Sequence, residues 1–380
     1  MSWPLYFDHN ATTPLLAEVV DAMQPYLTTH FGNPSSSHAY GREAKAAVER
    51  AREAVAALVG ASAPEVIFTS GGTEATQLAL RGSLPHPLSS AHVITTTVEH
   101  PATARTVDAL VAEGVTVTRL GVNEAGQLAL DALMAALTPS TRWVSVIHAH
   151  NETGVLQSLP GLSAVTKRHG VLLHADAAQS AGKVPLSLEV DGFDLLTLAA
   201  HKLYGPKGVG ALVVRSGVKL RPVQTGAGQE RGLRAGTENV ASIVGFGAAC
   251  AAAKRDLQET SARLISLRAQ LIDALRAGVP GLIIAGEHSA RLPNTVYALF
   301  PGVSGAALLE RTPRLAASTA SACHDGQEAA PQVLLEMKVP SSLAQGAVRL
   351  SMGRHTRPAD VEAAAAELIA AWRGSPSTGG

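Results

Sequence analysis

Apolar and polar positions follow two rhythms along the chain, one typical of amphipathic helices and one of buried strands. Short apolar runs predict strands at 66–69, 92–96, 115–120, 143–148, 171–175, 195–198 and 210–214. Segments with apolar residues at helical spacing predict helices at 42–59, 74–80, 103–113, 130–137 and 161–169. Strands that are apolar throughout and alternate with helices indicate an α/β fold. We expect a mainly parallel central sheet covered by helices on both faces.

The pattern changes near residue 240. An Ala-rich helical segment covers 240–277 and ends before Gly278 and Pro280, two residues that stop helices. Short strands at 283–284, 294–299 and 348–351 then alternate with helices at 305–311 and 359–372. We predict a large domain formed by residues 13–255 and a smaller α/β domain formed by residues 1–12 and 256–373. The Ser-, Pro- and Gly-rich tail, 374–380, is predicted to be disordered.

Composition narrows the class of protein. The chain has 380 residues, of which 46% are hydrophobic, and its 31 Lys and Arg balance 31 Asp and Glu. A chain without net charge has no general basic surface for nucleic acid or an anionic membrane. Neither a membrane-spanning apolar segment nor a signal-peptide pattern is visible. Two cysteines, Cys250 and Cys323, cannot form a disulfide framework. We therefore expect a cytoplasmic enzyme.

Residues with useful chemistry follow several predicted strands. In a parallel α/β sheet, ligands bind beyond the carboxyl ends of the strands. These positions hold Gly72, Thr73, His100, Asn151, Asp176, His201 and Lys202. Gly72 and Thr73 open a helix, whose first N–H groups and dipole favour an anion such as phosphate. The same two residues also fit an ordinary glycine turn with a Thr cap.

The other residues have ordinary explanations when each is taken alone. His100 could stack on a planar ring or face solvent. Asp176 ends an apolar strand, where it could keep a ring nitrogen protonated or cap a helix. Lys202 follows an apolar strand, where burial would make its amine nucleophilic, or its side chain could extend to solvent. His148 and His150 could share a zinc ion, but no third ligand lies at short spacing, so we expect no metal.

Taken together, these residues form the set that pyridoxal phosphate requires. The helix opened by Gly72 would hold the phosphate, and Asp176 would hold the pyridine nitrogen. His100 would stack on the ring, and Lys202 would bind the aldehyde.

The sequence also resembles a known family, the class V, fold-type I pyridoxal-phosphate enzymes. Within that family it resembles the cysteine desulfurases and the closely similar selenocysteine lyases. The resemblance runs from Tyr6 to about Trp372. It is carried by the segments 8–14, 32–36, 68–74, 99–100, 151–154, 174–179, 201–208, 228–231, 234–239 and 349–354. It implies a homodimer with its active sites at the subunit interface.

The resemblance implies a role for each cofactor-binding residue. Lys202 would be the Schiff-base lysine, and His100 would stack on the ring. Asp176 and Gln179 would contact the pyridine nitrogen and the phenolic oxygen. The remaining cofactor contacts would come from Gly72, Thr73, Asn151, His201 and Thr237 of the partner subunit. The substrate would be bound by Asn10, Asn151 and Arg354.

Cys323 decides the chemistry that the resemblance implies. It lies in 320–326, a segment of small and polar residues. In cysteine desulfurases this cysteine receives sulfur as a persulfide, and in selenocysteine lyases it helps to discriminate selenium from sulfur. We therefore expect conversion of L-cysteine to L-alanine, with sulfur placed on Cys323 and passed to an acceptor protein. Cys250, in the Ala-rich helix, is expected to be structural.

Three departures from the desulfurase pattern leave alternatives open. Ala199 stands where a Ser is common, and His150 where an Asn is usual. The segment that follows Cys323 is more similar to selenocysteine lyases, so conversion of L-selenocysteine to L-alanine and selenide is the main alternative. Another class V aminotransferase or lyase, and a non-catalytic binding protein, are remoter alternatives.

Overall fold

A seven-stranded sheet forms the centre of the computed structural model, which describes residues 3–319 and 330–375. The strand order is β2-β8-β7-β6-β5-β3-β4. The strands are β2 (Val66–Thr69), β3 (His92–Thr96), β4 (Thr116–Leu120), β5 (Thr141–Ile147), β6 (Leu172–Asp176), β7 (Leu195–Ala199) and β8 (Gly210–Val214). Neighbours from β7 to β4 pair in parallel, whereas β8 is antiparallel to both β2 and β7. The predicted, mainly parallel sheet is confirmed.

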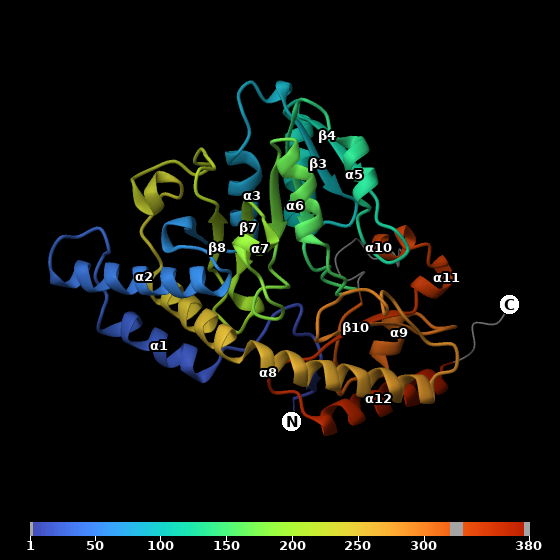
Figure 1. Cartoon of the computed structure of the whole chain (residues 1–380). Helices are drawn as coiled ribbons and strands as arrows, with labels where there is room; N and C mark the ends of the chain where they lie inside the picture. The colour runs from blue at the N-terminus through green and yellow to red at the C-terminus, as the bar shows by residue number, and fades with distance from the viewer. Residues whose placement is uncertain (1–2, 320–329, 376–380) are drawn as a thin grey trace.

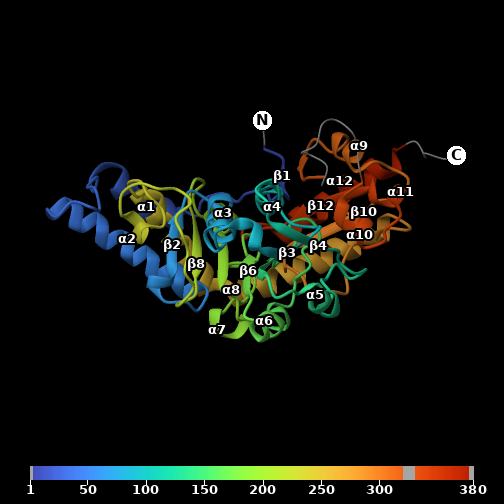
Figure 2. The ribbon, with the colours of Figure 1, turned by 90° about the horizontal axis from the view of Figure 1, so that it is seen from above.

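Helices cover both faces of this sheet (Figure 1, Figure 2). On one face lie α3 (Gly72–Gly82) and α4 (Pro101–Ala112), and on the other lie α5 (Leu130–Ala136), α6 (Leu159–Arg168) and α7 (Leu188–Asp191). Beside them, α1 (Ala17–Thr28) and α2 (Ala39–Leu58) pack against α8 (Val240–Gly278). Every residue of β2, β3 and β7 is buried, whereas the edge strand β4 is only partly covered, with Thr116 and Arg119 exposed.

The long helix α8 connects two hydrophobic cores. Its first half packs into the core of the large sheet, and its second half contributes Leu264, Leu267, Leu271 and Leu275 to a separate core. A three-stranded antiparallel sheet in the order β12-β10-β9 forms that second core with α12 (Pro358–Arg373). Its strands are β9 (Ile283–Ile284), β10 (Thr295–Leu299) and β12 (Ala347–Ser351). Around it lie α9 (Gly305–Glu310), α10 (Gln332–Glu336) and α11 (Ser341–Ala344).

The N-terminal segment packs with the second core. Strand β1 (Leu5–Tyr6) pairs in parallel with β11 (Leu315–Ala316), and Phe7 is buried in the second core. Residue Asp8 forms a bridge with Ser351 at the end of β12. The backbone N–H of Thr13 then donates to the carbonyl of His201, beyond the end of β7. Residues 8–13 therefore connect the second core to the strand ends of the large sheet.

Several predicted boundaries shift by a few residues. The helix predicted at 161–169 begins at Leu159, because Pro160 fits the first turn of a helix. The strand predicted at 143–148 covers Thr141–Ile147, so His148 lies outside it. The division of the chain into domains stays a prediction, since α8 belongs to both cores.

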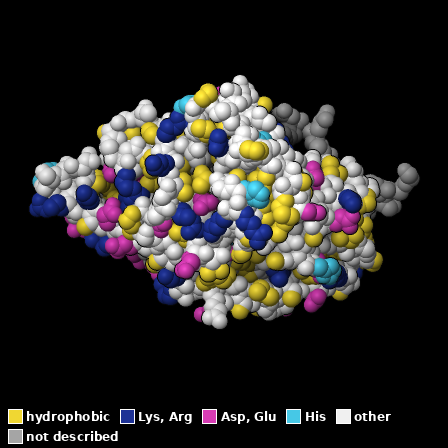
Figure 3. Space-filling view, turned by 45° about the horizontal axis from the view of Figure 1, so that its top comes forward, with side chains coloured by type: hydrophobic (Ala, Val, Ile, Leu, Met, Phe, Trp, Pro, Cys, Tyr) yellow, Lys and Arg dark blue, Asp and Glu magenta, His cyan; other side chains and the backbone are white. Residues whose placement is uncertain are grey.

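The surface carries its charges unevenly. In the view of Figure 3, Lys and Arg side chains gather across the middle of the molecule, although the whole chain has no net charge.

Among the helices of residues 3–319 and 330–375, none is long and apolar enough to cross a bilayer.

Candidate active site

Lys202 lies in a short helical turn directly after β7, where it is half-buried. Its Nζ donates to the carbonyl oxygens of Asn10 at 2.6 Å and Ala11 at 2.8 Å. Burial and the positive charge of Arg349 lower the pKa of Lys202 to about 8. A substantial fraction of this amine is therefore unprotonated in mildly alkaline solution, which a nucleophilic lysine requires.

Asp176 and His100 lie close enough to Lys202 for their charges to affect one another. Asp176 ends β6, is buried, and accepts a hydrogen bond from the N–H of Ala178 at 2.9 Å. Burial raises its pKa, while the nearby His100 and Lys202 lower it. His100 ends the turn after β3 and caps α4, with its Nδ1 accepting from the N–H of Ala102 at 3.1 Å. The structure thus brings together three residues that the sequence placed at separate strand ends.

The N-terminus of α3 lies beside the end of β7, the strand that precedes Lys202, and no side chain of the described residues caps it. A methyl group added to Gly72 would come within 3.5 Å of the Cβ of Ala199 at the end of β7. Ala199 therefore places a methyl group beside the helix N-terminus, where the Ser of the common pattern would place a hydroxyl. Thr73 is exposed in the first turn of the helix. These N–H groups are available to an anion.

His201 adjoins Lys202 and contacts the N-terminal segment. Its Nδ1 lies 3.2 Å from the Oγ1 of Thr12. Burial, followed by the charges of Lys202, Lys207 and Lys183, lowers the pKa of His201 to about 4. The imidazole is therefore neutral at physiological pH and can donate one hydrogen bond.

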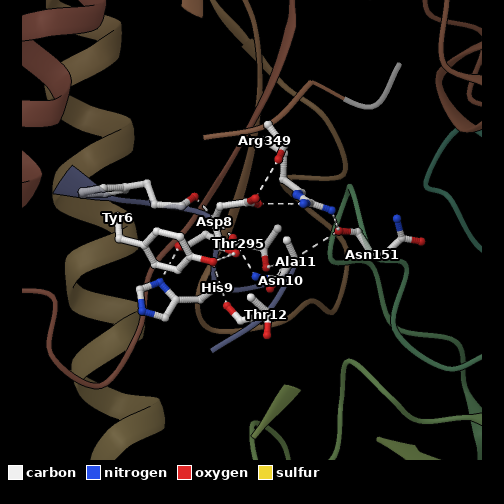
Figure 4. A network of polar contacts seen from close by, with 12 residues as sticks. Tyr6, Asp8, His9, Asn10, Ala11, Thr12, Asn151, Thr295 and Arg349 are labelled. Carbon is white, nitrogen blue, oxygen red and sulfur yellow. Dashed lines mark hydrogen bonds and ion pairs between the residues drawn. The ribbon is translucent and has the colours of Figure 1, made fainter. Parts of the chain in front are cut away.

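Asn10 holds several parts of the site together (Figure 4). The backbone carbonyl oxygen of Asn10 accepts from Lys202 and, at 2.8 Å, from the Nε2 of Gln179. The Oε1 of Gln179 in turn accepts from Lys183 at 3.0 Å. The side-chain Nδ2 of Asn10 donates to the Oγ1 of Thr295 at 2.9 Å and to the carbonyl of Asn151 at 3.3 Å. Both amide hydrogens of Asn10 thus have protein acceptors. In this structure the backbone of Asn10 positions Lys202 and Gln179, and its expected role in substrate binding stays a prediction.

Arg349, in the middle of β12, is a residue that sequence analysis did not single out. Its Nη2 donates to Asp8 at 2.7 Å and its Nη1 to the carbonyl of Asn151 at 3.0 Å (Figure 4). Its Nε is buried and has no hydrogen-bond partner among the described residues. A charged residue inside a buried strand was the available indication, since such a side chain requires a partner or a ligand.

Arg354, which was expected to bind the substrate, has its side-chain contacts on α8 and Tyr204. Its Nη1 forms an ion pair with Asp256 of α8 at 2.7 Å, and its Nη2 donates to the carbonyl of Ala252 at 3.1 Å. Its guanidinium also stacks over the ring of Tyr204, 5.6 Å from the ring centre. The structure thus gives this guanidinium protein partners on α8 and leaves Arg349 as the arginine whose charge acts on Lys202.

Those remaining predicted residues that the structure describes are not brought into this cluster. Thr237 is exposed, and Cys323 lies outside the described residues. Cys250 is buried in α8, and burial raises the pKa of its thiol, as expected for a structural cysteine. His148 and His150 do not converge. His148 contacts the hydroxyl of Ser180 at 2.9 Å, and His150 accepts from backbone N–H groups of its own loop.

Comparison with known proteins identifies the family. The class V aminotransferase family model matches residues 5–364. The chain belongs to this family. Residues of the chain are 42% identical over 360 positions to a cysteine desulfurase of Trichormus azollae, covering 94% of this chain and 90% of the relative.

Solved structures with the same fold support the family assignment. A NifS-like protein superposes with a TM-score of 0.90 at 34% identity, over 97% of this chain and 98% of the other. A second structure, described as SspA in complex with cysteine, has a TM-score of 0.82 at 30% identity, over 91% of this chain and 98% of the other. The resemblance to class V enzymes is therefore confirmed, as is the fold. The selenocysteine lyase alternative is not favoured, because the relatives found by sequence, including the one from Trichormus azollae, are named cysteine desulfurases.

Proposed function

We propose that this chain is a pyridoxal-phosphate-dependent cysteine desulfurase that converts L-cysteine to L-alanine and transfers the sulfur to Cys323. The observation that carries the proposal is the juxtaposition of the Lys202 amine, the buried Asp176 carboxyl and His100 at the strand ends. The desulfurase names of the relatives and the cysteine complex of one structural neighbour support the substrate.

The residues present fit pyridoxal phosphate. Lys202 would bind the aldehyde, and Asp176 would hold the pyridine nitrogen. The uncapped N-terminus of α3 and His201 would hold the phosphate, joined by Thr237 of the partner subunit in a homodimer. Gln179 would reach the phenolic oxygen with its amide, whose orientation Lys183 and Asn10 set. When bound, the cofactor supplies an electron sink for the charge that develops at the substrate Cα.

Arg349 would bind the substrate carboxylate. Its guanidinium has a buried Nε without a partner in the described part of the chain, and a planar guanidinium suits a carboxylate. Asn151 lies beside it, since the Asn151 carbonyl accepts from Arg349 at 3.0 Å. We assign the carboxylate to Arg349 in place of Arg354, whose guanidinium is bound to Asp256 and Ala252.

The chain's own groups account for proton and sulfur transfer. Once its amine is free, Lys202 can accept the proton from the substrate Cα, because its lowered pKa allows a neutral Nζ. The Cys323 thiolate attacks the substrate sulfur, so that an S–S bond forms and the C–S bond breaks. L-cysteine and the Cys323 thiol thus become L-alanine and a Cys323 persulfide, whose outer sulfur would then pass to a thiol of an acceptor protein and regenerate the Cys323 thiol.

The test is the release of alanine from L-cysteine by protein loaded with the cofactor, and of sulfide when a thiol reductant is added to reduce the persulfide. We expect Lys202→Ala to lose the absorption band of the lysine-bound cofactor and to lose alanine formation on the order of a thousandfold or more. Cys323→Ser should keep the band and lose the persulfide, detected by mass spectrometry of the intact protein. Cys250→Ser is the matched control and should leave both unchanged.

Two outcomes would contradict the proposal. Equal turnover of L-cysteine by wild type and Cys323→Ser would remove the persulfide step. Turnover of L-selenocysteine with L-cysteine inert would make the protein a selenocysteine lyase.

A further inference from the structure

Glu99 lies directly before His100, at the point where β3 ends. Its Oε1 accepts from the hydroxyl of Thr96 at 2.6 Å and from the backbone N–H of Ile147 at 2.9 Å. Ile147 is the last residue of β5 and stands opposite Asp176 in the pairing of β5 with β6. The side chain of Glu99 therefore ties the end of β3 to the end of β5, beside the strand that carries Asp176.

The other carboxyl oxygen of Glu99 lies in a different environment. Its Oε2 is inaccessible to solvent and makes no hydrogen bond to any residue that the structure describes. An ionised carboxylate with a bare, buried oxygen would be costly, because nothing compensates the lost hydration. A protonated acid avoids that cost. Two donors already face Oε1, so the proton belongs on Oε2.

The charges around the two neighbouring carboxyls differ. Asp176 lies near His100 and Lys202, which both favour its ionised form. Glu99 has Asp176 as its charged neighbour, and a like charge favours the protonated form. Burial, helped by Asp176 and opposed by the Thr96 and Ile147 hydrogen bonds, raises the pKa of Glu99 to about 8. Of the two buried acids, Glu99 is therefore the one that keeps its proton.

We propose that Glu99 is a positioning residue that acts as a neutral carboxylic acid, holding the ends of β3 and β5 so that His100 and Asp176 keep their places. The site thereby gains a rigid polar contact without a second negative charge beside Asp176. The cofactor-related part of this role rests on the proposed function, whereas the protonation of Glu99 does not.

The first experiment detects the proton directly. The infrared difference spectrum between wild type and Glu99→Gln is measured on cofactor-free protein at neutral pH. We expect the C=O stretching band of a protonated, buried carboxylic acid that Glu99→Gln lacks. The control is Glu113→Gln, which removes an exposed carboxylate and should leave that band in place. In wild type the band should disappear as the pH rises past about 8, a measurement that needs no variant.

The second experiment separates a neutral acid from an anion. The side-chain amide introduced by Glu99→Gln offers an oxygen to the same two donors and carries no charge. This variant should therefore bind pyridoxal phosphate within about threefold of wild type. The pH dependence of the bound-cofactor absorption should also be unchanged. Glu99→Ala loses both hydrogen bonds, and its cofactor dissociation constant should rise by about tenfold or more.

The proposal is overturned if wild type shows no protonated-acid band, or if Glu99→Gln displaces the pH dependence of the absorption as loss of a negative charge would. The desulfurase proposal is tested independently. A protein that leaves L-cysteine intact but shows the band would refute the desulfurase activity and retain the neutral Glu99.

Discussion

Arg349 and Arg354 lie five residues apart in one motif, yet their surroundings differ. Both side chains are largely buried, with exposed fractions of 11% and 14%, and each forms an ion pair at 2.7 Å. Arg354 points to α8, where Asp256, a backbone carbonyl and the Tyr204 ring surround it. Arg349 faces the N-terminal segment and the Asn151 loop, and its Nε lacks a partner in the described residues.

This difference indicates which arginine is available to a ligand. A buried donor left unpaired costs about 1–3 kcal/mol, and a ligand that pairs with it recovers that cost. The Arg354 guanidinium is already paired with Asp256, so a ligand would first have to displace that carboxylate. The motif contains both arginines, and only their partners distinguish the proposed ligand-binding residue, Arg349, from Arg354, which contacts α8.

The largest expected effect is on substrate use by Arg349 variants. Arg349→Lys keeps the charge but loses the planar guanidinium, so kcat/KM for L-cysteine should fall by about 10- to 100-fold. The methyl ester of L-cysteine lacks the carboxylate and is the matched substrate. Its kcat/KM should be nearly the same in wild type and variant, whereas an equal fall for both substrates would contradict carboxylate binding.

The next effect is on the pH dependence of cofactor uptake. An unprotonated Lys202 reacts with the aldehyde, so the rate of pyridoxal phosphate incorporation into cofactor-free protein should rise with pH and level off above about 8. Arg349→Gln removes the positive charge that helps to lower this pKa, so the midpoint should move to higher pH. Arg354→Gln should not move it. Stopped-flow absorption at several pH values gives both midpoints.

A smaller effect is expected for Arg354. Arg354→Ala removes the ion pair with Asp256 and should lower the free energy of unfolding by about 1–2 kcal/mol, measured by denaturant titration. The KM for L-cysteine should stay within about threefold of wild type. A rise in KM as large as that of Arg349→Lys would restore Arg354 as the carboxylate-binding residue.

The smallest effect is a pH dependence of stability. The Arg255 and Arg354 hydrogen bonds lower the pKa of Asp256 to about 2. The folded state therefore binds fewer protons than the unfolded state between about 2 and the ordinary aspartate pKa of 3.8. The contribution of Asp256 is complete above that range and is lost as the pH falls through it. In Asp256→Asn this part of the acid dependence, measured by denaturant titration at several acidic pH values, should disappear.

The part of the site built by the large sheet could be predicted from sequence. Asp176 and Lys202 each follow an apolar run, and parallel strands bring such ends to one edge. Consecutive β-α units usually lie side by side in this architecture. The proximity of Asp176 and Lys202 could therefore be predicted without knowing how distant parts of the chain pack.

The part built by the second core could not be predicted in this way. Asp8 accepts a hydrogen bond from Arg349 because the N-terminal segment pairs with distant strands. In that segment β1 pairs with β11, and Asp8 forms a bridge with Ser351. These contacts join positions more than 300 residues apart, as in the hydrogen bond between Asn10 and Ser351. Local periodicity carries no information about such pairing. Local periodicity also cannot predict which of Arg349 and Arg354 faces Asp256, because that depends on where α8 lies.

The attachment of the N-terminal segment to β11 and β12 has a consequence for synthesis of the protein. A ribosome makes residues 3–13 more than 300 residues before Arg349, so the nascent chain can form much of the large sheet before the N-terminal segment has its partners. Contacts of such high sequence separation form late and slowly. The backbone carbonyls of Asn10 and Ala11 that hold Lys202 therefore take their final places only after β12 has been translated, so the proposed cofactor site is assembled late in synthesis.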